Sequence, residues 1–177
     1  DIVDQAKDFD LDWKELDVKT FFAGEKFTEA YRQHILRKIG SKGTFTDCIS
    51  VYGSADAAIL GHETPITTLV RKLATKDPII AQALFHEPVI PSLVNYHPTL
   101  KYFQTVGEKI VFSTYSGIPL IRYAIGDRGG ILNYEEMKNL LGSQGIDLEK
   151  EIKENKLTHF DWKLPFVYLF GRTDLTA

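Results

Sequence analysis

The residues best suited to chemistry lie between Pro119 and Arg128, where an apolar, strand-like run ends at Gly126-Asp127. This layout would project the Asp127 carboxylate from the end of a strand. Such a carboxylate can accept hydrogen bonds from both hydroxyls of a ribose, and charge-assisted bonds of this kind are about twice as strong as neutral ones. An ordinary surface turn is the alternative, because Gly-Asp is common in turns. The motifs elsewhere in the chain bear on this choice.

A second strand end of the same kind covers residues 50–56, Ser-Val-Tyr-Gly-Ser-Ala-Asp. Tyr52 offers a ring that can lie against a flat base, and Gly53 lets the backbone approach a ligand closely. Asp56 could hold a magnesium ion, which prefers oxygen ligands. An edge tyrosine followed by a loop is the alternative interpretation.

Two weaker strand ends flank these motifs. Upstream, residues 20–23 run into Gly24-Glu25 before a predicted helix, and downstream residues 168–170 run into Gly-Arg-Thr-Asp at residues 171–174. Glu25 could instead stabilise the helix N-terminus through its interaction with the helix dipole. The order of the four motifs along the chain is more informative than any one of them.

That succession resembles the adenylate-forming enzymes, which include acyl-CoA synthetases, luciferases and peptide-synthetase adenylation domains. The element Pro-Leu-Ile-Arg-Tyr before Gly-Asp is most similar to the phenylacetate-CoA ligase and coenzyme F390 synthetase branch. The resemblance extends from about Thr20 to Asp174 and covers the middle of such an enzyme. It implies ATP or AMP, Mg²⁺ and coenzyme A as cofactors, and a small carboxylic acid as the substrate.

The resemblance also implies roles for individual residues. Tyr52 would stack on the base, Asp127 would hold the ribose hydroxyls, and Arg172 would assist near the ribose and phosphate. Asp56 matches the acidic residue near magnesium, and Asp174 matches the hinge between the large and small domains. The implied nucleotide-binding positions are Gly24, Glu25, Tyr52, Gly53, Ser54, Asp127 and Arg172.

Adenylation also needs a mobile Ser/Thr/Gly-rich loop with a lysine, because phosphoryl and nucleotidyl transfer depend on positioning and charge stabilisation. Residues 40–44 have suitable types but fit better as a turn between a helix and a strand. Residues 113–119 are also small and polar, but they lead directly into the Arg-Tyr element with no lysine after Pro119 in that element. In the family this loop precedes the region that resembles our chain, and a catalytic lysine lies beyond the hinge. We therefore expect a fragment of the large N-terminal domain, without catalytic residues and inactive alone.

The predicted function of the parent is an ATP-dependent, AMP-forming acid:CoA ligase, with an aryl acid such as phenylacetate as one candidate substrate. The family usually has Thr-Glu where this chain has Ala55-Asp56, which removes a hydroxyl and shortens the acidic arm. This difference motivates the alternative of a noncatalytic nucleotide- or acyl-binding protein from the same family. A structural domain with coincidental turns is a third hypothesis.

Composition restricts the partners. Hydrophobic residues make up 44% and charged residues 25% of the 177 residues, and the formal net charge of −3 gives no electrostatic footprint for nucleic acid. A single cysteine, Cys48, fits a reducing compartment, so we expect a cytoplasmic protein. No apolar run approaches the ~20 residues that span a bilayer. The five histidines show no spacing typical of metal ligands, and His62-Glu63 is interpreted as a loop pair capping the helix at Pro65.

The elements that must position these residues begin with an α/β unit. Residues 18–23 have strand character. Residues 28–39 have an amphipathic helical pattern, with Thr28 as N-cap and Gly40 at the C-terminal stop. Residues 45–51 return to strand character.

Beyond this unit the pattern predicts helices and then short strands. Helices are expected over residues 65–74 and after Asp77-Pro78, where proline suits the first turn. Extended runs separated by Pro or Gly turns favour an antiparallel or barrel-like sheet; they cover residues 92–96, 101–106, 109–115 and 120–125. Two further helices and a last strand are expected over residues 134–141, 147–156 and 166–170.

We therefore expect an α/β fold, a partial large domain of an adenylate-forming enzyme in which an α/β layer is followed by an antiparallel, barrel-like sheet. Residues 1–95 would form an α/β subdomain that carries the adenine-pocket strands. Residues 96–177 would form a mainly β subdomain with a helical insertion at residues 134–156, ending at the interdomain hinge.

Overall fold

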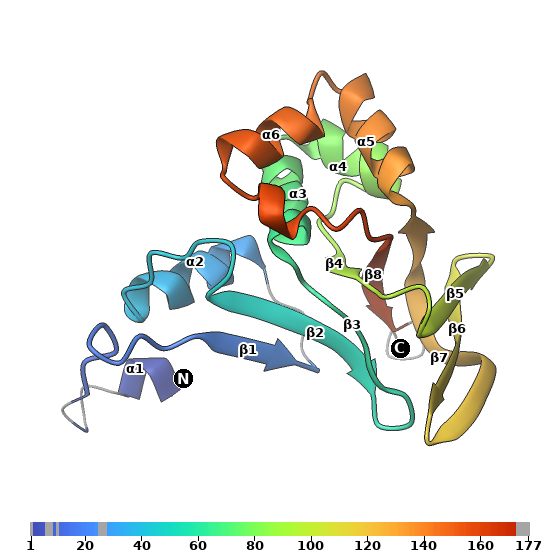
Figure 1. The fold of residues 1–177 in the computed structure, drawn as a ribbon, viewed down its shortest axis with the longest axis horizontal. Helices are drawn as coiled ribbons and strands as arrows, with labels where there is room; N and C mark the ends of the chain where they lie inside the picture. The colour runs from blue at the N-terminus through green and yellow to red at the C-terminus, as the bar shows by residue number, and fades with distance from the viewer. Residues whose placement is uncertain (1, 6–8, 10, 25–27, 173–177) are drawn as a thin grey trace.

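The computed structural model describes residues 2–5, 9, 11–24 and 28–172 of the chain. Two predicted site residues, Glu25 and Asp174, lie outside the described residues. The helices and strands are labelled in Figure 1; in chain order they are α1 (Ile2–Gln5), β1 (Thr20–Ala23), α2 (Glu29–Lys38), β2 (Cys48–Ser54), β3 (Ala58–His62), α3 (Pro65–Lys76), α4 (Pro78–Phe85), β4 (Ser92–Asn95), β5 (Lys101–Val106), β6 (Lys109–Ser116), β7 (Ile118–Leu132), α5 (Tyr134–Ser143), α6 (Leu148–Glu154), the 3₁₀ helix η2 (Thr158–Phe160) and β8 (Phe166–Arg172).

The eight strands found among the described residues belong to one mixed sheet, in the order β1-β2-β3-β4-β8-β7-β6-β5. β1 and β2 are parallel and are connected through α2, as a parallel pair requires a crossover. Every other adjacent pair in the described sheet is antiparallel. The predicted α/β class is confirmed. No helix in the described part of the chain has the length and apolar character that a membrane span needs.

Local signals set the starts of the helices. The Thr28 hydroxyl accepts a hydrogen bond from the Tyr31 N–H, and α2 begins at the next residue. The chain leaves that helix through Gly40, whose φ of +67° is easy for glycine. α3 begins with a capping box formed by Thr64 and Thr67, and proline occupies the first turn of both α3 and α4. These predicted helices are confirmed.

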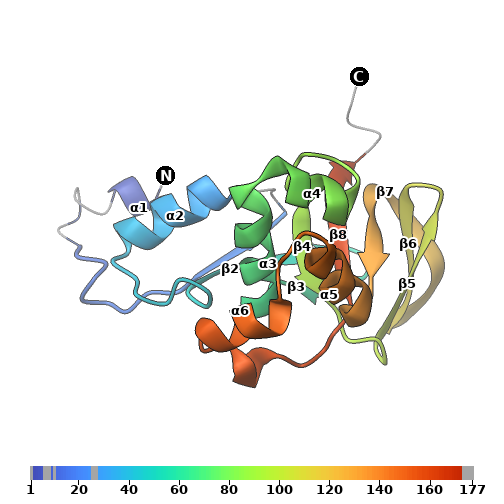
Figure 2. The same cartoon turned by 90° about the horizontal axis from the view of Figure 1, so that it is seen from above.

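The central strands separate two layers. Leu93, Phe166 and Tyr168 face the cluster formed by α3, α4, α5 and α6, which packs on one side of the sheet (Figure 2). Val94 and Leu169 face the other side, together with residues of β3, β5 and β6. This alternation follows from the period of two along a strand. The face opposite the helix cluster is therefore available for a site.

Both predicted subdomains contribute to this sheet and its core. β4 ends at Asn95, where the predicted boundary lies, and pairs with β8. The predicted insertion at residues 134–156 contains α5 and α6, which share one hydrophobic cluster with α3 and α4. The division at residue 95 itself stays a prediction.

Three strand predictions are corrected by the structure. β2 covers Cys48–Ser54 and not residues 45–51, so the Tyr-Gly-Ser motif lies within this strand. β3 was not predicted at all. β7 is longer than the predicted 120–125, so Gly126-Asp127 lies within a strand and not at a turn that ends one. The backbone of Gly126 has a φ of +87°, and the register shifts between Arg128 and Gly129, so the strand bends without ending.

Candidate functional site

An open groove of about 930 Å³ lies on the sheet face opposite the helix cluster. Val94 and Leu169 contribute apolar surface to it, and the end of β2 and the middle of β7 contribute polar groups. Every described residue that the sequence assigned to nucleotide or metal binding lines this groove: Gly24, Tyr52, Gly53, Ser54, Asp56, Asp127 and Arg172. The fold thus brings together positions from four separate motifs.

Tyr52 and Asp127 are joined directly. The Tyr52 hydroxyl donates to Asp127 Oδ2 at 2.7 Å, across 75 positions of sequence. Only 8% of the Asp127 surface is exposed. Burial, and then the neighbouring Asp127 carboxylate, raise the pKa of Tyr52, because both disfavour the phenolate. The phenol is therefore a neutral donor to the carboxylate at all ordinary pH values.

A second tyrosine crosses the groove in the opposite direction. The Tyr123 hydroxyl of β7 donates to Asp56 Oδ2 at 2.8 Å, just beyond the end of β2. This hydrogen bond raises the pKa of Tyr123. The sequence motifs quoted Tyr123 without giving it a role. Only the approach of β7 to the end of β2 reveals the pair.

Besides Asp56, which follows β2, the charged groups of the groove come from the neighbouring strands β6, β7 and β8. Arg172 of β8 is directly opposite Asp127 of β7, and directly paired residues on antiparallel strands share a face. Lys109 of β6 also lines the groove and was missed by the sequence interpretation. The groove therefore contains both carboxylates and cationic side chains, which suits a ligand with both hydroxyl and anionic groups.

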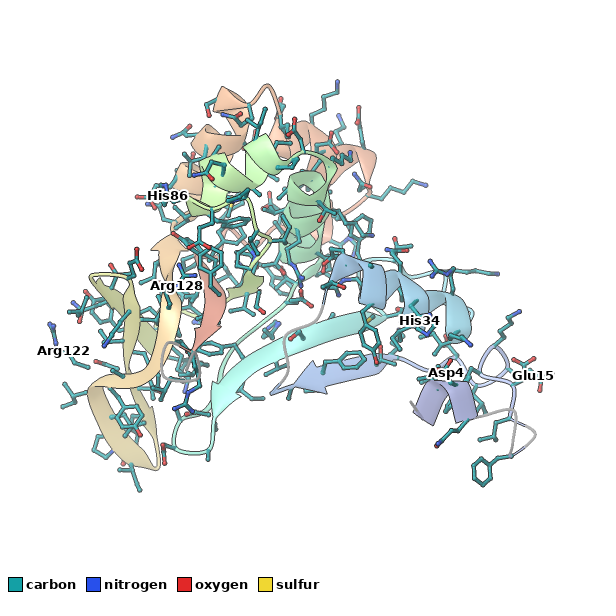
Figure 3. All side chains as sticks on the ribbon, turned by 180° about the vertical axis from the view of Figure 1, so that it is seen from behind. Asp4, Glu15, His34, His86, Arg122 and Arg128 are labelled. Atoms are coloured by element: carbon teal, nitrogen blue, oxygen red, sulfur yellow. The ribbon has the colours of Figure 1, made fainter. Side chains whose placement is uncertain are left out.

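The two arginines that flank Gly126-Asp127 in the sequence do not line the groove. Arg128 forms an ion pair with Glu87, just after α4, and lies 4.6 Å from the centre of the Phe170 ring. Arg122 lies on the outer side of the β6–β7 hairpin (Figure 3). Because successive side chains of a strand point to opposite faces, Arg128 fastens β7 to the helix side while Asp127 faces the groove.

The structure also corrects the reason for glycine at position 53. The prediction was that Gly53 allows close approach of a ligand. A Cβ at this position would collide with the backbone oxygen of Ala58 in β3, so the close approach is between two strands. The register shift between Tyr52 and Gly53 marks the same irregularity.

Asp56 was predicted to hold magnesium. The described residues contain no group of three or more His, Cys, Asp or Glu side chains that could hold a metal ion. A magnesium ion at Asp56 would therefore need most of its oxygen ligands from outside these side chains, and this ion usually keeps several waters.

A buried ion-pair network behind the groove escaped the sequence interpretation. Glu63 was predicted to belong to a loop pair that caps a helix, but it is buried, with 2% of its surface exposed. Its Oε1 lies 2.6 Å from both Arg32 and Arg71. Its Oε2 accepts a hydrogen bond from the Ser50 N–H at 2.7 Å. Glu29 completes the network through Arg32 Nε at 3.0 Å and Arg71 Nε at 3.2 Å. The network ties α2 and α3 to β2, whose Ser50 lines the groove. The i,i+3 spacing of Glu29 and Arg32 was a local signal for part of it.

No protein-family model, curated protein or solved structure matches the chain. The family resemblance thus depends on the four motifs alone. The function has to be inferred from those motifs and from the chemistry of the groove.

Proposed function

We propose that the groove binds the adenosine part of ATP or AMP, and that the chain belongs to an ATP-dependent, AMP-forming carboxylic acid:CoA ligase. The observation that carries the proposal is the convergence of Tyr52, Asp127 and Arg172, from three strands, on one groove. These are the residues for which the motif order implied a base, a ribose and a phosphate contact. Their side-chain chemistry suits those three parts of a nucleotide.

A nucleotide would contact both the apolar and the charged residues that line the groove. The base would lie against the apolar surface near Tyr52 and Val94, since every base has a flat face that stacks on such surfaces. The ribose hydroxyls would donate to Asp127 in charge-assisted bonds. Arg172 and Lys109 would attract the phosphates, and Asp56 would share a magnesium ion with them.

In the proposed reaction a carboxylate oxygen of the acid attacks the α-phosphorus of ATP, and the bond to the leaving pyrophosphate breaks. The thiol of coenzyme A then attacks the acyl carbonyl, forms the thioester, and AMP departs. The residues of this groove hold and orient the nucleotide through both steps. We assign no bond-making role to any residue of the chain.

Binding is tested by calorimetric titration of AMP and GMP into the full chain. We expect AMP to bind, and Asp127→Asn to weaken AMP binding by about tenfold or more, since one charged hydrogen-bond acceptor is lost. The matched control is Asp17→Asn, which makes the same change at an exposed position with a φ of +44°, a conformation that asparagine tolerates. Equal affinities in both variants would refute the ribose contact.

The ligase claim has its own test, which is carboxylate-dependent exchange of pyrophosphate into ATP by the proposed parent protein. The alternative is a noncatalytic nucleotide- or acyl-binding protein, favoured by the short Asp56 arm that Tyr123 already engages. AMP binding without exchange for any acid would support this alternative. Exchange with one class of acid would name the substrate.

A further inference from the structure

The two tyrosine–aspartate hydrogen bonds across the groove are chemically alike but differ in their surroundings. The bond from Tyr123 to Asp56 is exposed to solvent, whereas the bond from Tyr52 to Asp127 is partly buried. Water can replace a lost donor at Asp56. At Asp127 it can do so much less easily, because that residue is almost fully buried.

A buried carboxylate needs hydrogen bonds to remain ionised and to keep one orientation. The Tyr52 hydroxyl supplies one of them, to Oδ2, and its ring is anchored by Phe103 at a centroid distance of 6.4 Å. A donor to the ionised form of an acid favours that form. The tyrosine is itself held neutral by burial and by the carboxylate. The neutral Tyr52 hydroxyl is therefore always the donor of this hydrogen bond, and the Asp127 carboxylate is always the acceptor.

We propose that Tyr52 is the positioning residue of Asp127, and that its hydroxyl holds this carboxylate ionised and oriented for the hydroxyls of a nucleoside. The assignment rests on the proposed nucleotide site and adds to it. Stacking of the Tyr52 ring on a base needs only the ring, whereas positioning needs the hydroxyl. Tyr52→Phe separates these two roles, because it keeps the ring and removes one oxygen.

Other titratable groups face the same groove and would influence Asp127. They come from β2 and the turn after it, from β6, from β7 itself and from β8, and they are Tyr52, Asp56, Lys109, Tyr123 and Arg172. All of them remain in Tyr52→Phe except the one hydroxyl. A change in the titration of Asp127 in this variant therefore reports the loss of that donor.

The direct experiment follows the Asp127 carboxyl carbon by NMR during a pH titration of the full chain. We expect its pKa to be higher in Tyr52→Phe than in the wild-type chain, because the ionised form loses a donor. Tyr96→Phe is the matched control: this tyrosine is also packed on Phe103, at 4.7 Å, and does not line the groove. An Asp127 titration that is the same in all three proteins would overturn the assignment.

Binding of adenosine, which carries no phosphate that titrates near neutral pH, provides the second readout. We expect Tyr52→Phe to bind adenosine on the order of tenfold more weakly at neutral pH. As the pH is lowered, Asp127 becomes protonated and the affinity for adenosine should fall. We expect this fall to begin at a higher pH in Tyr52→Phe than in the wild-type chain, and the pH profile of Tyr96→Phe to match the wild type. An unchanged pH profile in Tyr52→Phe would also overturn the assignment.

The two proposals fail in different ways. A wild-type chain that binds neither adenosine nor AMP, with the expected NMR shift in Tyr52→Phe, would refute the nucleotide site and retain the control of Asp127 by Tyr52. A chain that binds adenosine, with no NMR shift in the variant, would refute the positioning role alone.

Discussion

Replacing Glu63 with glutamine should strongly destabilise the protein, because Glu63 is a buried member of an ion-pair network with Arg32 and Arg71. The network holds two arginines and two glutamates, so its formal charges cancel. In Glu63→Gln, Arg32 and Arg71 keep their charges with only Glu29 to balance them. Burial opposes ionisation of Arg32, but Glu63 and Glu29 together raise its pKa, so it is charged at any working pH.

The magnitude follows from the cost of leaving a buried charge without its partner, which is about 3–5 kcal/mol. For a chain of this length that corresponds to a fall in melting temperature of roughly 6–20 °C. The free energy of unfolding is measured by urea denaturation. An m-value equal to that of the wild type would show that the variant still unfolds in a two-state manner and has only become less stable.

Glu154→Gln is the matched control for this prediction. Glu154 is exposed and lies 3.8 Å from Lys150 in an i,i+4 pair, so its loss should change stability by less than about 0.5 kcal/mol. If Glu63→Gln and Glu154→Gln cost the same, the buried network is not a stabilising element. A loss below about 1 kcal/mol in Glu63→Gln would refute the reasoning.

Two other predictions concern stability. Gly53→Ala would place a Cβ against the backbone oxygen of Ala58, and should lower the free energy of unfolding in urea by about 1–3 kcal/mol. Gly142→Ala is the control, because Gly142 lies in open space near the end of α5. This change should be neutral or stabilising by up to ~1 kcal/mol. Equal effects would contradict the strand contact. Burial tends to raise the pKa of Asp47, but hydrogen bonds, led by that from the Ser41 hydroxyl, bring it below its usual value. The carboxylate therefore stabilises the fold above about pH 4 and loses this effect as the pH falls through its lowered pKa. The difference in free energy of unfolding between the wild type and Asp47→Asn should therefore become smaller in acid. A difference that does not depend on pH would contradict this.

Several elements could be predicted from the sequence because their signals are local. The cap at Thr28 and the proline after Asp77 each act within one helical turn, and the helices begin where these residues place them. The bounds of β5, Lys101–Val106, agree with the prediction, because a glycine turn follows the alternating strand directly. β7 was predicted too short because Gly126-Asp127 resembles a turn locally, and only its pairing with β8 keeps it in the sheet.

By itself the sequence determined the α/β class, most of the helices and strands, and four motifs with chemistry suited to a nucleotide. It could not determine that Tyr52 donates to Asp127, that Tyr123 engages Asp56, or that Glu63 is the centre of a buried network. Those contacts join residues far apart in the chain, and strand register and the curvature of the sheet decide them. Capping and turn preferences act over a few residues, whereas a hydrogen bond across a groove exists only when the whole sheet has brought its two partners together.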